Sequence, residues 1–337
     1  MTTDDRSRDR PDDGGVVRTT EQFGRELGVE QGVGPVELIP EAIADVELAP
    51  TAEPIPRTQW QLFRRRFLRH RLAVISAVVL VTLYVLCFTA KWWVPMDPNK
   101  QDLLLGPVSP RGAHWFGTDE LGRDQFARII YAGQISLKIG IAVALISTIA
   151  GAALGAVAGF YGKLTDQLLM RVTDLFLVVP AIAILAIALR RFGKSDTTII
   201  LVLAGLFWMY VARIVRGQVL SIREREFVEA ARAAGASSPR IILRHILPNI
   251  IGPIVVNATL GVATAIITES TLSFLGFGVQ PPRTSWGNML STAEGYVGTS
   301  TAYLLYFPGL AILLTVLAVN FLGDGLRDAF DPQSEKH

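Results

Sequence analysis

The sequence predicts an all-α membrane protein that crosses the bilayer six times. Half of its 337 residues are hydrophobic and only 18% are charged, with a mean hydropathy of +0.38, unlike an ordinary soluble domain. Six apolar runs approach the roughly 20 residues that a helix needs to cross about 30 Å of hydrocarbon. Because backbone groups in lipid must be paired within their own segment, we expect helices rather than open strands.

The first 56 residues differ in composition from the rest of the chain. They hold 13 Asp or Glu against five Arg, with many Gly and Pro and few aromatic residues. Such a segment cannot bury enough apolar surface to offset the entropy of ordering, so we predict a disordered acidic cytoplasmic tail. Residues 333–337 are expected to form a short second tail.

Residues 57–71 predict an amphipathic helix at the membrane interface, directly before the first span. From residue 60 the stretch reads WQLFRRRFLRHR, which mixes Trp, Phe and Leu with five Arg. Aromatic and basic side chains together suit a helix that lies at the lipid headgroups.

Residues 72–332 are predicted to form the transmembrane domain, with a polar loop at 213–249. Its spans are predicted at 72–90, 137–160, 168–189, 197–212, 250–267 and 303–322. Lys and Arg gather on the cytoplasmic side of membrane helices. Five Arg precede the first span and seven lie within 213–245, whereas 276–302 contains only Arg283. Both termini are therefore predicted to be cytoplasmic, with Arg190, Arg191 and Lys194 as an exception in a short external loop.

Small residues on the second span indicate close helix packing. Gly151, Gly155 and Gly159 recur every four residues and line one helix face, where a neighbouring backbone can approach closely. The neighbour is either another helix of this chain or a second subunit.

Polar residues within the other spans are candidates for a pathway or gate. Arg171 and Asp174 lie one helical turn apart, where an ion pair would lower the cost of placing both near lipid, as a structural pair or as part of a gate. Asn257, Thr264 and Glu269 belong to the helix of the fifth span and could line a path; the alternative is that Glu269, at the outer end of that span, is close enough to water to need no special role.

The polar segment, residues 226–249, reads EFVEAARAAGASSPRIILRHILPN between two apolar runs. Strong helix formers extend over 223–234, and Gly235 is expected to end that helix because it tolerates the left-handed conformation. A second short helix is expected with Ser238 as its cap and Pro239 in its first turn.

Pro248 is expected to end the second helix near the membrane. The first helix offers a low-profile face of alanines that would let another protein come near, beside charged residues that can fix its orientation. The alanines are Ala230, Ala231, Ala233 and Ala234, and the charged residues include Glu226, Glu229 and Arg232. From the residues alone, the segment either binds a partner or folds back onto its own spans.

Patterns for catalysis, metal binding and nucleic-acid binding are missing from the sequence. The stretch FGKSD at 192–196 lacks the earlier Gly of a phosphate-binding loop, since position 188 is Ala. The four His have no metal-ligand spacing, and the chain has a single Cys. Basic residues flank apolar runs instead of forming a separate face, which argues against nucleic-acid binding. We expect no active site, no metal and no directly bound cofactor.

Five motifs resemble the permease subunits of binding-protein-dependent ATP-binding-cassette importers. The polar segment is similar to the EAA loop of this family, with His245 where the general pattern has Ile, as in the peptide and nickel branch. The matching residues there are Glu229, Ala230, Ala231, Gly235, Leu247 and Pro248. The other motifs are FGTDELGRD at 116–124, ARIVRGQ at 212–218, SFLGFGVQPP..SWG at 273–287 and GDGLRDAFDP at 323–332. The likeness covers about 60–332 and is nearest the C-type permease of oligopeptide or dipeptide systems.

The resemblance implies a type I importer permease fold in a bacterial cell membrane. It implies that a coupling helix within 223–248 docks on a cytoplasmic ATPase. The partners it implies are two ATP-binding subunits, a homologous second permease subunit in a heterodimer and an extracytoplasmic binding protein, with ATP and Mg used by the ATPases. The implied cargo is a peptide, with nickel, glutathione or another small solute as alternatives.

The motif FGTDELGRD is expected to form a charged turn at the external mouth. The residues involved are Gly117, Asp119, Gly122, Arg123 and Asp124. The turn either orders a loop that meets the binding protein or forms internal salt bridges that only shape the loop.

Two other classes of function are weighed against transport. An intramembrane enzyme would require catalytic polar groups that meet within the spans, such as Glu269 or Asp174. A membrane scaffold would recruit partners through the acidic tail. Neither explains an ATPase-type loop together with the four other motifs.

Overall fold

The computed structural model describes residues 59–331 except Val179 and Lys194, so both predicted tails lie outside the described residues. The described residues are almost entirely helical and contain isolated β-bridges but no strand. Five helices are long and apolar enough to cross a membrane, and a bent helix pair provides a sixth candidate. The predicted all-α membrane fold is therefore confirmed.

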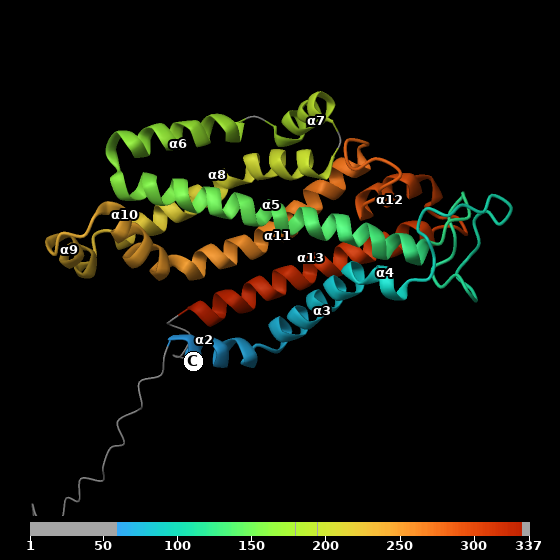
Figure 1. The fold of residues 1–337 in the computed structure, drawn as a ribbon, viewed down its shortest axis with the longest axis horizontal. Helices are drawn as coiled ribbons and strands as arrows, with labels where there is room; N and C mark the ends of the chain where they lie inside the picture. The colour runs from blue at the N-terminus through green and yellow to red at the C-terminus, as the bar shows by residue number, and fades with distance from the viewer. Residues whose placement is uncertain (1–58, 179, 194, 332–337) are drawn as a thin grey trace, which may run out of the picture. The chain divides into compact units, whose positions relative to one another are not determined.

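Five long helices lie side by side in Figure 1, with short helices at both ends. In chain order the helices are α2 (Gln59–Arg69), α3 (Arg71–Phe88), α4 (Ala90–Trp93), α5 (Gln125–Tyr161), α6 (Lys163–Val178), α7 (Ala181–Phe192), α8 (Asp196–Ile222), α9 (Glu226–Ala233), α10 (Ser238–Ile241), α11 (Ile251–Phe274), α12 (Trp286–Ala293) and α13 (Tyr303–Phe330). A π-helical turn (Ile242–Ile246) and a 3₁₀ turn (Leu247–Ile250) join α10 to α11, and a 3₁₀ turn (Glu294–Tyr296) follows α12.

Helix α5 begins at Gln125, well before the predicted span at 137–160. Asp124 caps it by accepting a hydrogen bond from the backbone N–H of Ala127 (2.8 Å). A carboxylate at this position satisfies an otherwise unpaired amide and interacts favourably with the helix dipole. The added turns mix apolar residues with Gln125, Arg128, Gln134 and Ser136, and these polar residues interrupt the apolar run, so its length alone could not reveal the helix start.

The glycine stripe of α5 lies against α8 of the same chain. A Cβ on Gly151 would come within 2.5 Å of the Trp208 carbonyl oxygen, and a Cβ on Gly155 within 2.4 Å of the Ala212 carbonyl oxygen. At Gly159 a Cβ would lie 2.8 Å from the Val219 Cβ. The stripe thus brings the two helices into backbone contact within one subunit, the first of the two neighbours considered from the sequence.

These contacts also show that α5 and α8 run parallel, because residue numbers rise together along both helices. Because α5 and α8 run in the same direction, the chain between them has to cross back to the end of the bundle where α5 begins. Helices α6 and α7 are that connection, so we assign them together as the sixth crossing.

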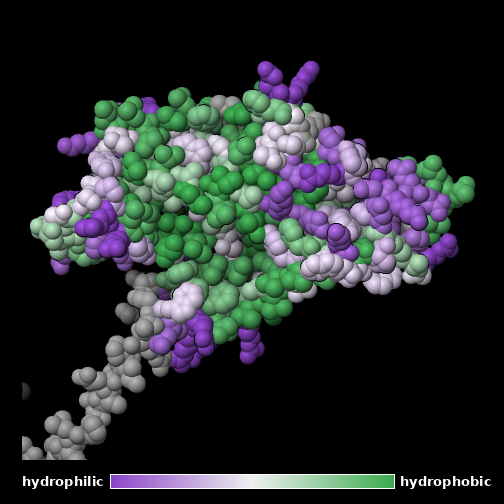
Figure 2. Space-filling view, in the orientation of Figure 1, coloured by the Kyte–Doolittle hydropathy of each residue, from purple (hydrophilic) through white to green (hydrophobic). Residues whose placement is uncertain are grey.

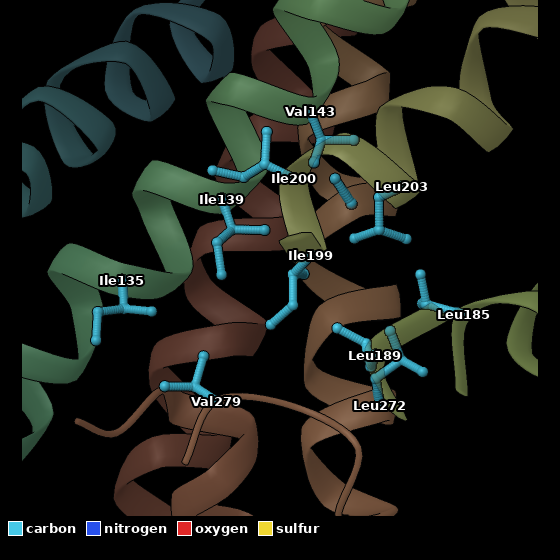
Figure 3. Close-up of a cluster of buried hydrophobic side chains, with 11 residues drawn as sticks. Ile135, Ile139, Val143, Leu185, Leu189, Ile199, Ile200, Leu203, Leu272 and Val279 are labelled. Atoms are coloured by element: carbon cyan, nitrogen blue, oxygen red, sulfur yellow. The ribbon is translucent and has the colours of Figure 1, made fainter. Parts of the chain in front are cut away.

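The third predicted span, 168–189, is therefore two helices rather than one. Helix α6 ends at Val178 and α7 begins at Ala181 with Pro180 as its N-cap, and the two axes differ by 84°. Proline cannot donate the backbone hydrogen bond that a continuous helix would require at this position. Leu185 and Leu189 then anchor α7 in a cluster with side chains of α5, α8 and α11, as Figure 3 shows.

Helix α8 continues to Ile222, whereas the predicted span ended at 212 and assigned 213–222 to the polar loop. Val211, Val215 and Val219 are buried at four-residue spacing and join one apolar cluster with Ala156 of α5. Arg213 and Arg216 interrupt the apolar run in the sequence but are paired with acidic side chains of α6. Their pairing allows the helix to continue beyond the predicted boundary.

A lipid-facing surface surrounds this bundle. Large apolar side chains such as Val81, Leu145, Ile149 and Leu314 are more than half exposed. Figure 2 shows a predominantly hydrophobic band across the face in view, with hydrophilic side chains gathered toward the two ends. Such a broad exposed apolar surface is typical of a membrane interaction site.

Gly155 provides the direct test of the α5–α8 contact. We expect Gly155→Val to destabilise the fold by about 1–3 kcal/mol, because its Cβ would meet a backbone carbonyl that cannot rotate away. Thermal unfolding in a fixed detergent measures the difference.

The matched control is Gly205→Val on α8, whose added Cβ meets no atom within 4 Å. Equal losses in the two variants would show that the loss at Gly155 does not come from the close helix contact.

Candidate functional site

The polar segment folds as two helices that project from the end of α8. Residues 223–225 turn the chain, so α9 begins at Glu226 instead of at 223 as predicted. Arg223 holds this turn by donating from Nη1 to the Gly159 carbonyl of α5 (2.9 Å). Gly235 has φ +79° and ends α9, and the Ala236 N–H donates to the Ala231 carbonyl (3.0 Å).

The cap of the second helix is Ser237, so the prediction of Ser238 is wrong. Ser237 is extended (φ −67°, ψ 151°), and its carbonyl accepts the first intrahelical bond from Ile241 (2.9 Å). Ser238 and Pro239 are then the first two helical residues. Proline is tolerated there because the first amides of a helix have no intrahelical partner.

Pro248 does not end the second helix as predicted. The chain continues through the π turn and the 3₁₀ turn into α11. A proline removes one backbone donor and crowds the preceding turn, which π and 3₁₀ geometry accommodate. Leu247 is partly buried against the adjacent apolar cluster and Pro248 is exposed.

Helix α9 has one face on its own chain and one face open. Val228 is fully buried, and Ala231 is partly buried in the cluster that contains Val219, Ile241 and Ile246. The prediction that Ala231 belongs to the open alanine face is therefore wrong. Arg232 also turns toward its own chain, with its guanidinium 6.0 Å from the centre of the Phe160 ring.

The open face of α9, which we call the α9 face, consists of Phe227, Ala230, Ala233 and Ala234. These residues are exposed, as are Glu226 and Glu229 beside them and Gly235 after them. Phe227 is 43% exposed, and the sequence interpretation missed it. Its position three residues before Ala230, on the same side of a helix, is the signal that would have found it.

Asn257 and Thr264 lie in one groove, which α5, α7, α8 and α11 enclose. Thr268 and Thr271 extend the same stripe of α11. The Thr264 hydroxyl donates to the Leu260 carbonyl (3.1 Å), and the Asn257 side-chain amide donates to the Pro253 carbonyl (2.8 Å). The groove is lined mainly by apolar side chains, and the polar side chains of this α11 stripe donate to carbonyls of their own helix.

Glu269 does not share that groove, although the sequence placed it with Asn257 and Thr264. Its side chain is fully buried between α5, α11 and the segment that leads into α12. Ser273 donates to Oε1 (2.7 Å) and Ser136 donates to Oε2 (3.4 Å). Burying a carboxyl group costs free energy unless it is hydrogen-bonded, and these two serine hydroxyls offset part of that cost.

The two serines connect Glu269 to the start of α12. Ser136 accepts from the backbone N–H of Trp286 (3.2 Å), and Ser273 accepts from the Ser285 hydroxyl (3.2 Å). The Trp286 indole N–H donates to the Ile129 carbonyl (2.9 Å). Glu269 is thus the common acceptor of a network that fixes α12, an element that the sequence interpretation did not predict.

Arg171 and Asp174 do not pair with each other, so that prediction is wrong. Asp174 pairs with Arg213 of α8, and Asp166 pairs with Arg216, which donates from Nη2 at 2.6 Å. Both pairs join α6 to α8. Arg213 and Arg216 are three residues apart and so share one face of α8, and this spacing could have predicted that both pair with a neighbouring helix.

The charged loop, residues 116–124, is organised around Asp119. Arg123 donates from Nε to Asp119 Oδ2 (2.7 Å), and Arg128 pairs with the same oxygen. Asp119 Oδ1 also accepts from the backbone N–H of Leu121 (3.0 Å) and of Arg123 (2.9 Å). These internal bonds shape the loop, which was one of the two alternatives.

The two predicted glycines of this loop occupy left-handed positions with no free space. A Cβ on Gly117 (φ +78°) would lie 2.4 Å from the Val108 carbonyl oxygen, and a Cβ on Gly122 (φ +69°) 1.9 Å from the Asp102 carbonyl oxygen. Asp124 pairs with His114 Nδ1 (2.8 Å) in addition to capping α5. The predicted residues of this motif therefore do come together.

No cluster of three or more His, Cys, Asp or Glu with metal-binding geometry occurs within the described part of the chain. The arrangement joins a partly open helical segment at one end, a groove with one stripe of polar residues along the bundle, and a loop held by internal ion pairs at the other end.

Two family models match the sequence. Residues 151–336 match the model described as the binding-protein-dependent transport system inner membrane component. Residues 58–107 match the model of the N-terminal transmembrane domain of oligopeptide transport permease C.

Curated relatives are similar over most of their length. The oligopeptide transport system permease protein OppC of Mycobacterium bovis is 42% identical over 274 residues, which cover 80% of this chain and 93% of the relative. The OppC protein of Haemophilus influenzae is 40% identical over 279 residues, which cover 82% and 89%.

A solved structure of the MetNI methionine ABC transporter, in inward-facing conformations, has a similar fold. Its TM-score is 0.50 at 19% identity, with 61% of this chain and 97% of the solved chain covered.

Two substitutions at Glu269 test its role as the common acceptor. We expect Glu269→Ala to lower the free energy of unfolding by about 1–3 kcal/mol, because Ser136 and Ser273 would lose their buried acceptor. Glu269→Gln keeps the size and one carbonyl oxygen, so it should retain more stability. Hydrogen exchange should show the largest increase around α12, and unchanged protection there would contradict the network.

Proposed function

Because the chain belongs to the family of binding-protein-dependent transport system inner membrane components, we propose that it is the permease subunit that moves oligopeptides or dipeptides through an ATP-binding-cassette importer. Members of this family are multi-pass proteins of the bacterial inner membrane, and the described helices fit that location. The chain itself needs no active site for this role, since the ATPase activity belongs to partner subunits that bind ATP with Mg.

The α9 face is the observation that carries the proposal. Val228 fixes the helix to its own bundle, while Phe227 and the small side chains of Ala230, Ala233 and Ala234 remain open. An aromatic anchor beside a flat surface suits insertion into the cleft of a partner protein. We propose that this face docks on one of two ATP-binding subunits and that Glu226 and Glu229 orient it.

The packing behind the α9 face supports a mechanical connection to the spans. Val228 lies in the same apolar cluster as Val219 of α8, Ile241 of α10 and Ile246 of the π turn. A push on α9 would therefore reach α8 and α11 as a unit, and α8 carries α5 with it. Closure of the ATPases would bias this unit between inward-facing and outward-facing arrangements.

The groove that contains Asn257 and Thr264 is our candidate for the translocation pathway. We propose that a homologous second permease subunit covers it in a heterodimer, so that cargo moves between the two chains. The groove is mainly apolar, and its threonine hydroxyls and asparagine amide add hydrogen-bonding groups without fixed charge, a combination that suits peptides of varied sequence.

Orientation follows from the basic residues. We propose that both termini and the α9 face are cytoplasmic and that the charged loop is external, where an extracytoplasmic binding protein would deliver cargo. The network around Asp119 would give that binding protein a rigid surface to meet.

The class of cargo can be tested on the assembled transporter. Mass spectrometry of the purified complex should identify a second permease, two ATPases and a binding protein that retains peptide. Retention of nickel, glutathione or another small solute instead of peptide would contradict the proposed cargo while leaving the permease role intact.

Ala234→Arg tests the docking role of the α9 face. Ala234 is exposed, so the chain should still fold, but a long charged side chain at a packed interface should weaken ATPase binding by roughly tenfold or more, about 1.4 kcal/mol. Co-purification of the ATPases and stimulated ATP hydrolysis measure the effect.

The matched control is Ala113→Arg, the same exposed substitution in the loop at the opposite end of the bundle. It should leave ATPase binding unchanged. Full ATPase recovery with Ala234→Arg would rule out docking on this face.

A further inference from the structure

The outer face of α2, which we call the α2 face, combines cationic and apolar side chains that its own chain does not cover. It consists of Trp60, Arg64, Arg65, Leu68 and Arg69, all exposed, with Trp60 69% and Leu68 57% exposed. These residues line a shallow concavity on the helix.

Helical spacing separates this face from the one that holds α2 in place. Trp60, Arg64 and Leu68 recur every four residues on the outer side. Phe63 lies on the inner side and contacts the ring of Phe330 on α13, with centroids 4.5 Å apart, and it stacks on Trp60 at the edge of the α2 face, with centroids 5.3 Å apart. The bundle therefore fixes the orientation in which the outer side chains point away from it.

The three arginines of the α2 face differ from the paired arginines of the charged loop and of α8. Arg123, Arg213 and Arg216 each pair with an aspartate. Within the described residues, no carboxylate lies in ion-pair range of Arg64, Arg65 or Arg69. Three neighbouring guanidinium groups repel one another, so a bound anion would stabilise the arrangement.

The position of α2 places this charge beside the hydrocarbon. Helix α3, the first candidate span, begins at Arg71, two residues after α2 ends. Leu72 at its start is 53% exposed. An anion with acyl chains could pair with the arginines of the α2 face and also cover the exposed side chains of Leu68 and Leu72.

We propose that the α2 face is a binding site for an anionic phospholipid. The guanidinium groups would donate bidentate hydrogen bonds to the phosphate, Trp60 would lie at the headgroup level, and Leu68 would contact the acyl chains. Clusters of Lys and Arg beside a membrane helix attract anionic lipids in this way.

This lipid site has a packed connection to the rest of the bundle. On the inner side of α2, Arg66 donates from Nη1 to the Asp331 carbonyl at the end of α13 (2.6 Å). Phe330 in turn fills the space beside Gly252 in the first turn of α11, where an added Cβ would lie 2.9 Å from the Phe330 Cβ. A lipid on α2 would therefore stabilise the junction of α13 and α11, close to the polar segment.

A fluorescent probe at Leu72 can test the proposal in the full chain. The chain's single cysteine, Cys87, is buried, so Leu72→Cys gives an accessible thiol for labelling. The labelled protein is placed in phosphatidylcholine vesicles with increasing phosphatidylglycerol. The quencher is a spin label carried in separate experiments by each of the two lipids.

We expect spin-labelled phosphatidylglycerol to quench the probe at a lower mole fraction than spin-labelled phosphatidylcholine. Replacement of Arg64, Arg65 and Arg69 by Gln should raise the half-effect fraction of phosphatidylglycerol by roughly tenfold or more. Arg65→Gln alone should give a smaller shift in the same direction.

The matched control replaces Arg111, Arg190 and Arg191 by Gln, which removes the same charge from exposed sites outside α2. It should leave the lipid preference unchanged, and an equal shift would overturn the proposal. Equal quenching by both lipids in the labelled Leu72→Cys chain that keeps its three arginines would also overturn it. So would a probe that neither lipid quenches, the result expected if the acidic residues 1–56 covered the α2 face.

Discussion

The contact between the glycine stripe of α5 and the backbone of α8 is the constraint on which the rest of the bundle depends. Gly151, Gly155 and Gly159 leave no space for a side chain, so the two helices lie in parallel at close range. Parallel neighbours require a return crossing, which α6 and α7 provide. At Gly159 the same contact reaches Val219, close to the end of α8, where the polar segment leaves the bundle.

A rigid α5–α8 pair gives the polar segment a firm base. Val228 holds α9 against the cluster at the end of α8, and the π and 3₁₀ turns lead directly into α11. The segment is therefore continuous with two long helices. A force applied to its open face would move helices, whereas a flexible loop would absorb that force.

Much of the fold was predictable, because apolar run length and glycine spacing report on local geometry. The predictions were wrong where contacts between distant segments determine a helix boundary or the burial of a side chain. Arg213 and Arg216 ended a predicted span, yet their pairing with aspartates of α6 keeps α8 helical. Burial of Glu269 and the position of α12 depend on Ser136 and Ser285, which come from segments that residue spacing could not bring together. In the polar segment, the left-handed Gly235 could be predicted from residue type, whereas the inward turn of Ala231 depends on the cluster around Val228.

The central claim is that α9 transmits force from a docked ATPase to the bundle through opposite faces of one short helix. An electron cryomicroscopy structure of the assembled transporter in lipid nanodiscs tests it most directly. The account predicts that Phe227 and Ala234 are buried in a cleft of an ATP-binding subunit while Val228 stays packed in its own chain. An ATPase bound elsewhere, with the α9 face still exposed to solvent, would contradict it.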